Sequence, residues 1–221
     1  MEILKAEQVH YSYQTKYQTI DAVRGMSYSF ETGYMYAIVG ESGSGKSTFL
    51  SLLAGLDLPT MGNVYVGGDD MATLNRDIYR RDKASVVYQS YNLFPLLTAQ
   101  ENVMFPMELK GIKKQEAKEK AAELLERVGL PKQVLHQFPQ MMSGGEQQRV
   151  AIARAMATEG KIILADEPTG NLDSENERNI VRLLKETAHS LEYAVIVITH
   201  NPAVAAEADF ILKMRDGKLI D

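Results

Sequence analysis

Residues 40–48 read GESGSGKST and contain the complete pattern G-x-x-x-x-G-K-[ST]. Glycines in such a loop let the backbone curl, so that successive N–H groups point inward at the oxygens of an anion. A helix that follows the loop adds the positive end of its dipole. The apolar run 34–39 (YMYAIV) just upstream is typical of a buried strand. Residues 40–48 therefore predict a phosphate-binding loop between a strand and a helix.

The residues after the loop follow the spacing i, i+3, i+4, i+7 of one helix face. They are Phe49, Leu52, Leu53 and Leu56. In this setting Lys46 can reach the β- and γ-phosphates of a nucleotide, and the Ser47 hydroxyl can ligate Mg²⁺. The alternative is a flexible Gly/Ser-rich loop, which the flanking strand and helix disfavour. The chain is thus predicted to bind a nucleoside triphosphate.

Length, composition and charge limit the classes of protein to which the chain can belong. The 221 residues can form one sizeable core, with or without a subdomain, and the absence of cysteine excludes disulfides and thiolate metal sites. A net charge of −5 argues against nucleic acid as the main partner. Met1 is followed by a polar stretch rather than a signal peptide, and no apolar run reaches about 18 residues, so no membrane span is expected.

The first ninety residues predict mainly short strands. Residues 3–13 are expected to form an edge-type strand, with Val9, Tyr11 and Tyr13 on one face by alternation. One of these tyrosines can stack on a nucleotide base, or all of them can simply pack on a sheet. Other expectations are a loop at 14–19, a strand at 26–30 with a turn at 31–33, a turn at 59–63 before a strand at 64–66, and a helix at 73–83.

Gln89 directly follows a predicted strand at residues 85–88. Its amide oxygen can bind Mg²⁺ or a water, although a glutamine after a strand is more often an ordinary turn residue. Helical patterns then continue from residue 98 to about 160, and residues 98–142 are interpreted as a helical insertion between strands of the sheet. Within it, residues 113–127 carry charges at i, i+4 spacing, which is typical of a solvated helix face.

Residues 143–149 (SGGEQQR) open a further helix. Ser143 can cap this helix, and Gly144 and Gly145 leave its first N–H groups open to an anion. The same residues also fit an ordinary helix N-terminus. If they bind an anion, the chain has a second phosphate site besides the loop at 40–48.

A buried strand at residues 162–165 ends in Asp166 and Glu167. Asp166 can hold Mg²⁺ through a water, and Glu167 can polarise an attacking water. Without the phosphate-binding loop, they could equally be two acidic residues before a turn. A strand at 194–199 ends at His200, which is either functional or merely packed or solvated. Between these strands we expect a helix at 174–190, capped by Asp173 or Ser174, and after them a hairpin at 209–219 turned at 216–217.

The order of these motifs resembles that of the ABC-type ATPases over essentially all 221 residues. The matching motifs are Walker A (40–48), the Q-loop (Gln89), the signature (143–149), Walker B (ILADE, 163–167), the D-loop (171–173) and the switch histidine (His200). The strings LADEPTGNLD and SGGEQQRVAIARA are similar to one branch, which includes macrolide exporters, lipoprotein-release systems, antimicrobial-peptide resistance pumps and FtsE-like proteins. Two small departures are Met142, where Leu is usual, and Asn201, where Asp is commoner.

The resemblance implies an α/β P-loop fold with a RecA-like core sheet, an antiparallel β-subdomain and an inserted helical subdomain. It implies one domain, with residues 1–97 and 159–221 in the core and β-subdomain and about 98–158 in the helical subdomain. The implied ligands are ATP and Mg²⁺, with catalytic roles for Lys46, Glu167 and His200 and metal contacts from Ser47, Gln89 and Asp166. The implied nucleotide contacts are Tyr13 (selected over Tyr11), Gly40, Glu41, Ser42, Gly43, Ser44, Gly45, Lys46, Ser47, Thr48, Gln89, Ser143, Gly144, Gly145, Glu146 and Asp173.

For partners, the resemblance implies a two-fold homodimer in which each signature helix completes the ATP site of the other subunit. It also implies a separate membrane permease that docks near Gln89 to Leu97, and hence a location at the inner face of the cell membrane. A second interpretation stays open, in which an ABC ATPase without a permease drives assembly or scaffolding. A P-loop kinase or GTPase is disfavoured, because neither needs SGGEQQR and no N-K-x-D motif is visible.

Overall fold

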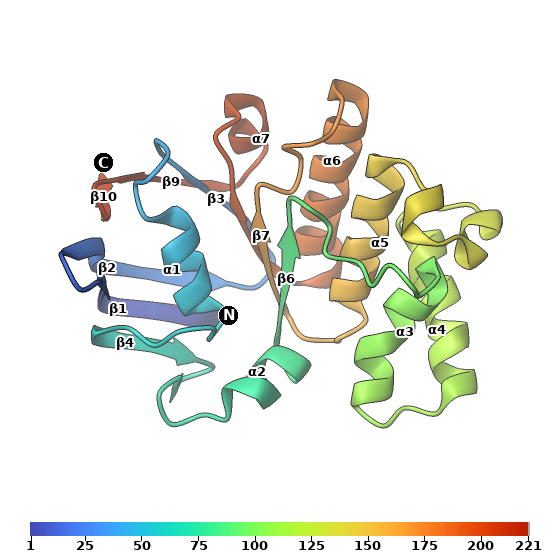
Figure 1. Ribbon diagram of the computed structural model, residues 1–221, viewed down its shortest axis with the longest axis horizontal. Helices are drawn as coiled ribbons and strands as arrows, with labels where there is room; N and C mark the ends of the chain where they lie inside the picture. Colours follow the sequence, from blue (N-terminus) through green and yellow to red (C-terminus); the bar gives the residue numbers. More distant parts are fainter. Residues whose placement is uncertain (221) are drawn as a thin grey trace.

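The computed structural model describes residues 1–220 and arranges them as two β-sheets with helix α1 (Lys46–Leu53) between them (Figure 1). The larger sheet has the order β10-β9-β3-β8-β7-β6 and is parallel except for β10, which pairs antiparallel with β9. Its strands are β3 (Met35–Val39), β6 (Ala84–Tyr88), β7 (Ile162–Asp166), β8 (Ala194–Ile198), β9 (Phe210–Arg215) and β10 (Lys218–Ile220). The predicted strands at 34–39, 85–88, 162–165 and 194–199 are confirmed.

The smaller sheet is antiparallel and has the order β2-β1-β4-β5. Its strands are β1 (Glu2–Gln14), β2 (Thr19–Glu31), β4 (Met61–Val66) and β5 (Asp69–Asp70). One face packs on α1 and the other faces solvent, as is common for antiparallel sheets. This sheet and the parallel one confirm the predicted combination of a core sheet with an antiparallel β layer.

Alternation along the central strands explains why the large sheet is covered on both faces. On β8, Ile196 and Ile198 pack toward α1 and the small sheet, whereas Val195 and Val197 pack on the opposite face. That opposite face contacts α5 (Gly144–Met156) and α6 (Ser174–Leu191). Continuous apolar strands such as AVIVI are what this double coverage requires.

The remaining helices lie mostly at one end of the molecule, where α3 (Ala99–Leu109) and α4 (Lys114–Arg127) pack beside α5 (Figure 1). Two short 3₁₀ turns, Lys132–His136 and Pro139–Met141, connect α4 to α5. The short helices α2 (Arg76–Asp82) and α7 (Pro202–Ala206) complete the described chain. Within residues 1–220, no helix combines the length and the apolar character that crossing a membrane requires.

Three predictions about the N-terminal elements were wrong in detail. Strand β1 is not an edge strand, because β2 and β4 pair with it on either side; its polar alternation reflects one solvent-facing side of the sheet. Strand β2 begins at Thr19 rather than Met26, since pairing with β1 supports a polar stretch that lacks strand periodicity. Strand β4 likewise begins at Met61, inside the predicted turn, through its pairing with β1.

The helix after the phosphate-binding loop is shorter than its apolar spacing predicts. Helix α1 ends at Leu53, and Gly55 then adopts a left-handed backbone with φ of 64°. The Gly55 N–H donates to Leu52 O and the Leu56 N–H to Ser51 O, which satisfies the last carbonyls of the helix. Leu56 is therefore turned out of the core and is 44% exposed.

Candidate functional site

The predicted phosphate-binding loop joins the end of β3 to the start of α1. Gly45 is the N-cap residue of α1, with φ of 96° and no side-chain cap, so the first N–H groups of the helix stay available. The Lys46 side chain is buried, and its Nζ donates to Gly40 O at 2.9 Å and to Glu41 O at 2.8 Å. This arrangement places backbone donors and an ammonium group around one hollow, which fits a polyphosphate.

Two glycines let the loop touch neighbouring backbone. A Cβ at Gly45 would overlap Ala22 O of β2, and a Cβ at Gly40 would overlap Met214 O of β9. Backbone hydrogen bonds extend the same junction, because Arg24 N donates to Gly217 O at 2.8 Å and Gly217 N donates to Ser44 O at 3.0 Å. The loop, β2 and the β9–β10 turn are thus held in direct contact.

The hollow beside the loop has a volume of about 490 Å³ and is lined from both sheets. The small sheet contributes Tyr13, Ile20, Asp21 and Ala22, and the large sheet contributes Asp166, Glu167, Ile198 and His200. Residues 20–22 were not singled out from the sequence, because no strand was predicted there. They reach the hollow because β2 pairs with β1 in a register that places Ile20 opposite Tyr13.

Tyr13 lies in this lining and Tyr11 lies outside it. The Tyr13 hydroxyl is 3.1 Å from Thr48 Oγ1, and its ring is 45% exposed. The Tyr11 ring supports it edge-on, with centroids 5.0 Å apart. Burial is the main cause that raises the pKa of the Tyr11 phenol. Tyr13 is therefore the tyrosine placed to meet a base.

Two oxygen ligands suitable for a divalent cation meet on the large-sheet side of the hollow. Ser47 Oγ donates to Asp166 Oδ1 at 3.3 Å. Burial raises the pKa of the Asp166 carboxyl, and the Ser47 hydrogen bond partly opposes that shift. Residues 1–220 contain no cluster of three or more His, Cys, Asp or Glu able to hold a metal ion. A hydroxyl and one carboxylate fit Mg²⁺ nonetheless, because this ion keeps several waters and binds substrate phosphates.

Glu167 and His200 form a direct pair at the carboxyl ends of β7 and β8. Glu167 has a left-handed backbone with φ of 49°, and its N–H donates to Ile198 O at 3.0 Å. One carboxylate oxygen, Oε1, lies 2.9 Å from His200 Nδ1. The Glu167 side chain is 21% exposed and that of His200 is 74% exposed. The Glu167 carboxylate is therefore part of the lining of the hollow, beside an imidazole that is largely exposed to solvent.

Gln89 lies outside the lining of the hollow. Its amide Nε2 donates to Asn171 Oδ1 at 3.1 Å, and Asn171 Nδ2 donates to Gln89 O at 3.2 Å. The structure therefore joins the predicted Q-loop to the predicted D-loop instead of joining Gln89 to Ser47 and Asp166. Asn171 was part of a sequence motif but was not predicted as a site residue.

The signature residues also lie apart from the hollow. The backbone N–H and hydroxyl of Ser143 donate to Glu146 Oε2 at 2.8 and 2.9 Å, and Glu146 N donates back to Ser143 Oγ at 3.3 Å, which is a capping box. Gly144 packs against the Tyr91 hydroxyl and Gly145 against Asn176, where a Cβ would overlap them. None of residues 143–146 lines the hollow, so one chain keeps its two predicted anion sites separate.

Asp173 confirms its predicted place as the N-cap of α6. Its carboxylate accepts from Glu175 N at 3.0 Å and from Asn176 N at 2.9 Å. Hydrogen bonding to Asn176 is the main cause that lowers the pKa of Asp173. The carboxylate is thus engaged within its own chain, and a nucleotide contact from this residue stays a prediction.

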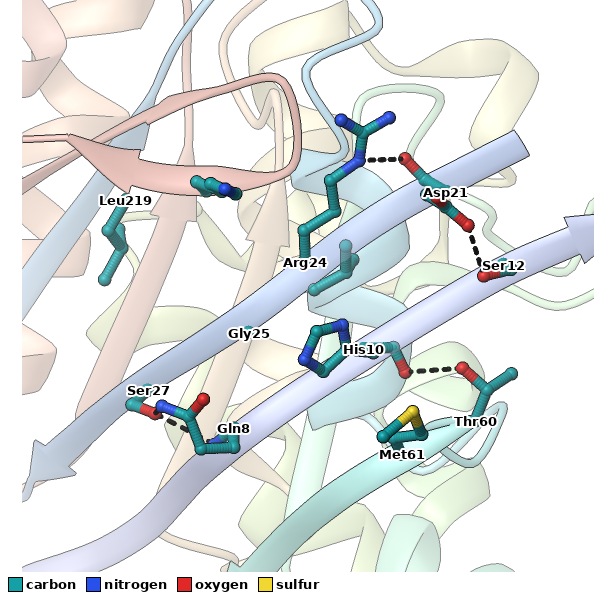
Figure 2. A pocket seen from close by; sticks show the side chains of 12 residues that line it. Gln8, His10, Ser12, Asp21, Arg24, Gly25, Ser27, Thr60, Met61 and Leu219 are labelled. Carbon is teal, nitrogen blue, oxygen red and sulfur yellow. Dashed lines mark hydrogen bonds between the residues drawn. The ribbon is translucent and has the colours of Figure 1, made fainter. Parts of the chain in front are cut away.

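A larger cavity of about 740 Å³ lies on the outer face of the small sheet, across from α1 (Figure 2). His10 lies at its centre, with Asp21 and Arg24 at one side. The Asp21 carboxylate accepts from Ser12 Oγ at 2.7 Å, and Arg24 Nε donates to Asp21 O at 3.3 Å. No residue of the phosphate-binding loop lines this cavity, so its size does not make it the nucleotide site.

A twisted parallel sheet with a phosphate-binding loop at the carboxyl end of β3 defines a P-loop nucleotide-binding protein. The sequence profile of the ABC transporter family matches residues 23–170, and the chain belongs to that family. It is an ATP-binding subunit with the ABC-type ATPase fold and activity.

Individual relatives agree with this assignment. The chain is 43% identical to the lipoprotein-releasing system ATP-binding protein LolD of Saccharophagus degradans, covering 98% of this chain and 96% of that protein. It is 39% identical to the macrolide export ATP-binding/permease protein MacB of Shigella flexneri, covering 99% of this chain but 34% of that longer protein. Among solved structures, the ATP-binding cassette MJ0796, a dimer bound to ADP and Pi, superposes with a TM-score of 0.91 at 37% identity and covers 99% and 97% of the two chains.

Proposed function

We propose that this ATPase powers a separate membrane permease by closing and opening as a head-to-tail homodimer around two ATP molecules. The observation that carries the proposal is the separation of the loop hollow from the Ser143 helix within one chain. A two-fold pair brings the loop of one copy to the signature helix of the other, which uses both anion sites for each nucleotide. The dimeric cassette MJ0796 supports this arrangement.

Within each composite site, the residues of this chain have different catalytic and binding roles. Lys46 neutralises charge on the β- and γ-phosphates, and Glu167 orients the attacking water and accepts its proton. His200 holds the Glu167 carboxylate in place through the 2.9 Å contact. Ser47 and Asp166 would hold Mg²⁺, which would supply positive charge to neutralise the phosphates. Ser143 and Gly145 of the partner subunit then cover the γ-phosphate.

We further propose that the permease docks on the cleft beside the Q-loop. This cleft has a volume of about 340 Å³, and its lining includes Tyr88, Phe94, Phe105 and Arg154. Leu96, just beyond it, is an apolar side chain with 86% exposure. Exposed apolar groups gathered at a cleft are typical of an interaction surface. Such docking would hold the chain at the inner face of the membrane.

Hydrogen bonds supply a physical connection from that cleft to the reaction. Arg154 donates to Tyr91 O and Asn92 O at 3.1 and 2.7 Å, which fixes the segment after Gln89 to α5. Gln89 is bonded to Asn171, and the nearby Gly170 N donates to Glu167 O at 3.1 Å. Movement of the docked permease is therefore expected to alter the position of Glu167. Relatives named for lipoprotein release and macrolide export support a release or export role for this chain.

Two inactive variants test the composite site. Ser143→Arg keeps an intact phosphate-binding loop but obstructs closure of the partner's site. Lys46→Ala keeps an intact signature helix but loses the lysine contact with the phosphates. Each variant alone is expected to lack ATPase activity. In a mixed dimer, one site pairs the intact loop of the first with the intact signature of the second, so activity should return on mixing.

Light scattering must accompany the mixing experiment, because the result is meaningful only when dimers form. As a matched control, Ser190→Arg places the same side chain at an exposed position near the end of α6 and should keep full activity on its own. Full activity in Ser143→Arg alone would falsify the composite site. Absence of recovery on mixing, although light scattering shows dimers, would also count against it.

A further inference from the structure

Three arginines from three helices converge on a further pocket, separate from those described above. The pocket has a volume of about 300 Å³ and lies between the end of α4, the middle of α5 and one face of α6. Arg127, Arg149 and Arg182 line it, and Glu186 contributes the one carboxylate. None of the predicted nucleotide-site residues lines this pocket, so it is distinct from the ATP site.

These arginines lack the partners that usually neutralise such groups. Within residues 1–220, none of the three forms an ion pair, and the one hydrogen bond among them runs from Arg182 Nη2 to Asn179 Oδ1 at 2.9 Å. Arg149 Nε is buried without any hydrogen-bond partner. A buried donor of a charged group without an acceptor carries a cost, which the negative charge of an anion beside the same guanidinium would offset.

The charge and the donors of the pocket indicate which anion fits. Three guanidinium groups and one carboxylate leave a net charge of +2, which a phosphate dianion neutralises. A carboxylate brings one negative charge and two oxygens, whereas a phosphate brings three or four oxygens for the three forked donors. We infer that this pocket binds a phosphate group, either free or as the monoester of a small molecule.

The location of the pocket gives such binding a mechanical effect. Helix α4 packs on α3 and α5 at one end of the molecule, whereas α5 and α6 lie against the large sheet. A phosphate held by Arg127, Arg149 and Arg182 at once ties these helices together. It therefore stabilises one position of α4 relative to α5 and α6. This inference does not depend on transport or on a permease.

Nuclear magnetic resonance of the arginine Nε–H groups tests the site directly. The protein is first saturated with Mg²⁺ and a β,γ-imido analogue of ATP, so that its loop is filled and no phosphate is released. Inorganic phosphate is then titrated at constant ionic strength. The signals of Arg149 and Arg182 are expected to shift saturably. Arg182→Gln, at an exposed position, should raise the apparent dissociation constant about tenfold, the scale of one charge-assisted hydrogen bond.

Arg178→Gln is the matched control, because Arg178 is exposed one turn earlier on α6 and lies outside the pocket lining. It should leave the phosphate titration unchanged. A second titration with glycerol 3-phosphate separates the two sources: tighter binding indicates a small phosphate ester, and weaker binding indicates the free ion. Non-saturating shifts, equal shifts with sodium chloride or acetate, or equal weakening by both variants would overturn the inference.

Discussion

At the scale of single residues, Glu167 shows how backbone and side chain are fixed together. Its left-handed backbone lets the N–H bond to Ile198 O while the carboxylate turns toward His200. A non-glycine residue in this conformation carries a cost that the surrounding contacts must offset. The sequence indicates a carboxylate after Asp166, but it does not indicate this conformation.

Glu167→Gln is expected to retain ATP binding and to lower turnover by a factor of about 10²–10⁴, because it removes the proposed general base and leaves the phosphate contacts intact. It should also accumulate a nucleotide-bound dimer, measured by light scattering with ATP. Glu175→Gln, an exposed change on α6, is the control. Near-normal hydrolysis by Glu167→Gln would remove this residue from the role.

Tyr13→Ala is expected to weaken adenine-nucleotide binding by about 1–2 kcal/mol, the scale of stacking between a base and an aromatic ring. Tyr13→Phe should bind nearly as well, because the ring remains and the lost Thr48 contact is exposed. Equilibrium titration with a fluorescent ATP analogue measures both. If Tyr11→Ala weakens binding and Tyr13→Ala does not, the wrong tyrosine has been assigned.

Asp166 makes stability depend on pH. Burial raises its folded-state pKa above the unfolded value, so this group favours folding below the unfolded pKa, and that contribution is lost as pH rises through the folded pKa. Asp166→Asn keeps an acceptor for Ser47 without the charge. It should be more stable than wild type in nucleotide-free protein at about pH 7, and this advantage should shrink toward about pH 4.

Urea unfolding of both proteins at the two pH values measures that difference, with Mg²⁺ and nucleotide left out. The variant should also lose most ATPase activity if Asp166 holds the metal. A stability difference that is the same at both pH values would show that burial of the charge is not its cause.

At the scale of elements, the start of α5 depends on one reciprocal contact. Ser143 caps the helix as predicted, and Glu146 completes a capping box with it, so that each side chain satisfies the backbone N–H of the other residue. The sequence therefore located this helix correctly. It could not locate the end of α1, because the apolar spacing continues to Leu56 while Gly55 turns the chain away. Local caps decide helix ends more strongly than periodicity does.

Glu146→Ala is expected to lower the free energy of unfolding by about 1 kcal/mol, the usual cost of losing a helix cap interaction. Glu146→Gln should cost less, because glutamine can also complete a capping box. Thermal unfolding of the nucleotide-free protein measures the difference. Equal losses for Ala and Gln would mean that the charge of Glu146, rather than the capping geometry, stabilises α5.

At the scale of the whole molecule, motif order predicted more than periodicity did. The core sheet, the antiparallel layer and the helical group all followed from the family resemblance, and the structure has them. The interior place of β1 and the long N-terminal extension of β2 did not follow, because pairing between distant segments creates them. For the same reason, the sequence did not predict that residues 20–22 line the hollow or that Gln89 forms a hydrogen bond with Asn171.

Leu96→Asp tests the proposed docking surface on the intact molecule. It should leave ATPase activity and stability of the isolated protein unchanged, because Leu96 is 86% exposed and lies outside the nucleotide hollow. Recovery of a membrane protein partner by affinity purification should fall at least several-fold. Met61→Asp, at a 67% exposed position on β4 outside that cleft, is the control. Unchanged recovery with Leu96→Asp would place the docking surface elsewhere.

Gly45 touches the Ala22 carbonyl of β2 in the small sheet, whereas Gly40 touches the Met214 carbonyl of β9 within the large sheet. The aromatic ring proposed to meet a base belongs to the small sheet, and the groups proposed to meet the phosphates follow strands of the large sheet. Gly45 lies against Ala22 across the junction of the two sheets, and this contact between backbones sets the spacing between them. A methyl group at Gly45 would force the sheets apart and so increase the distance between the groups proposed to meet the base and those proposed to meet the phosphates.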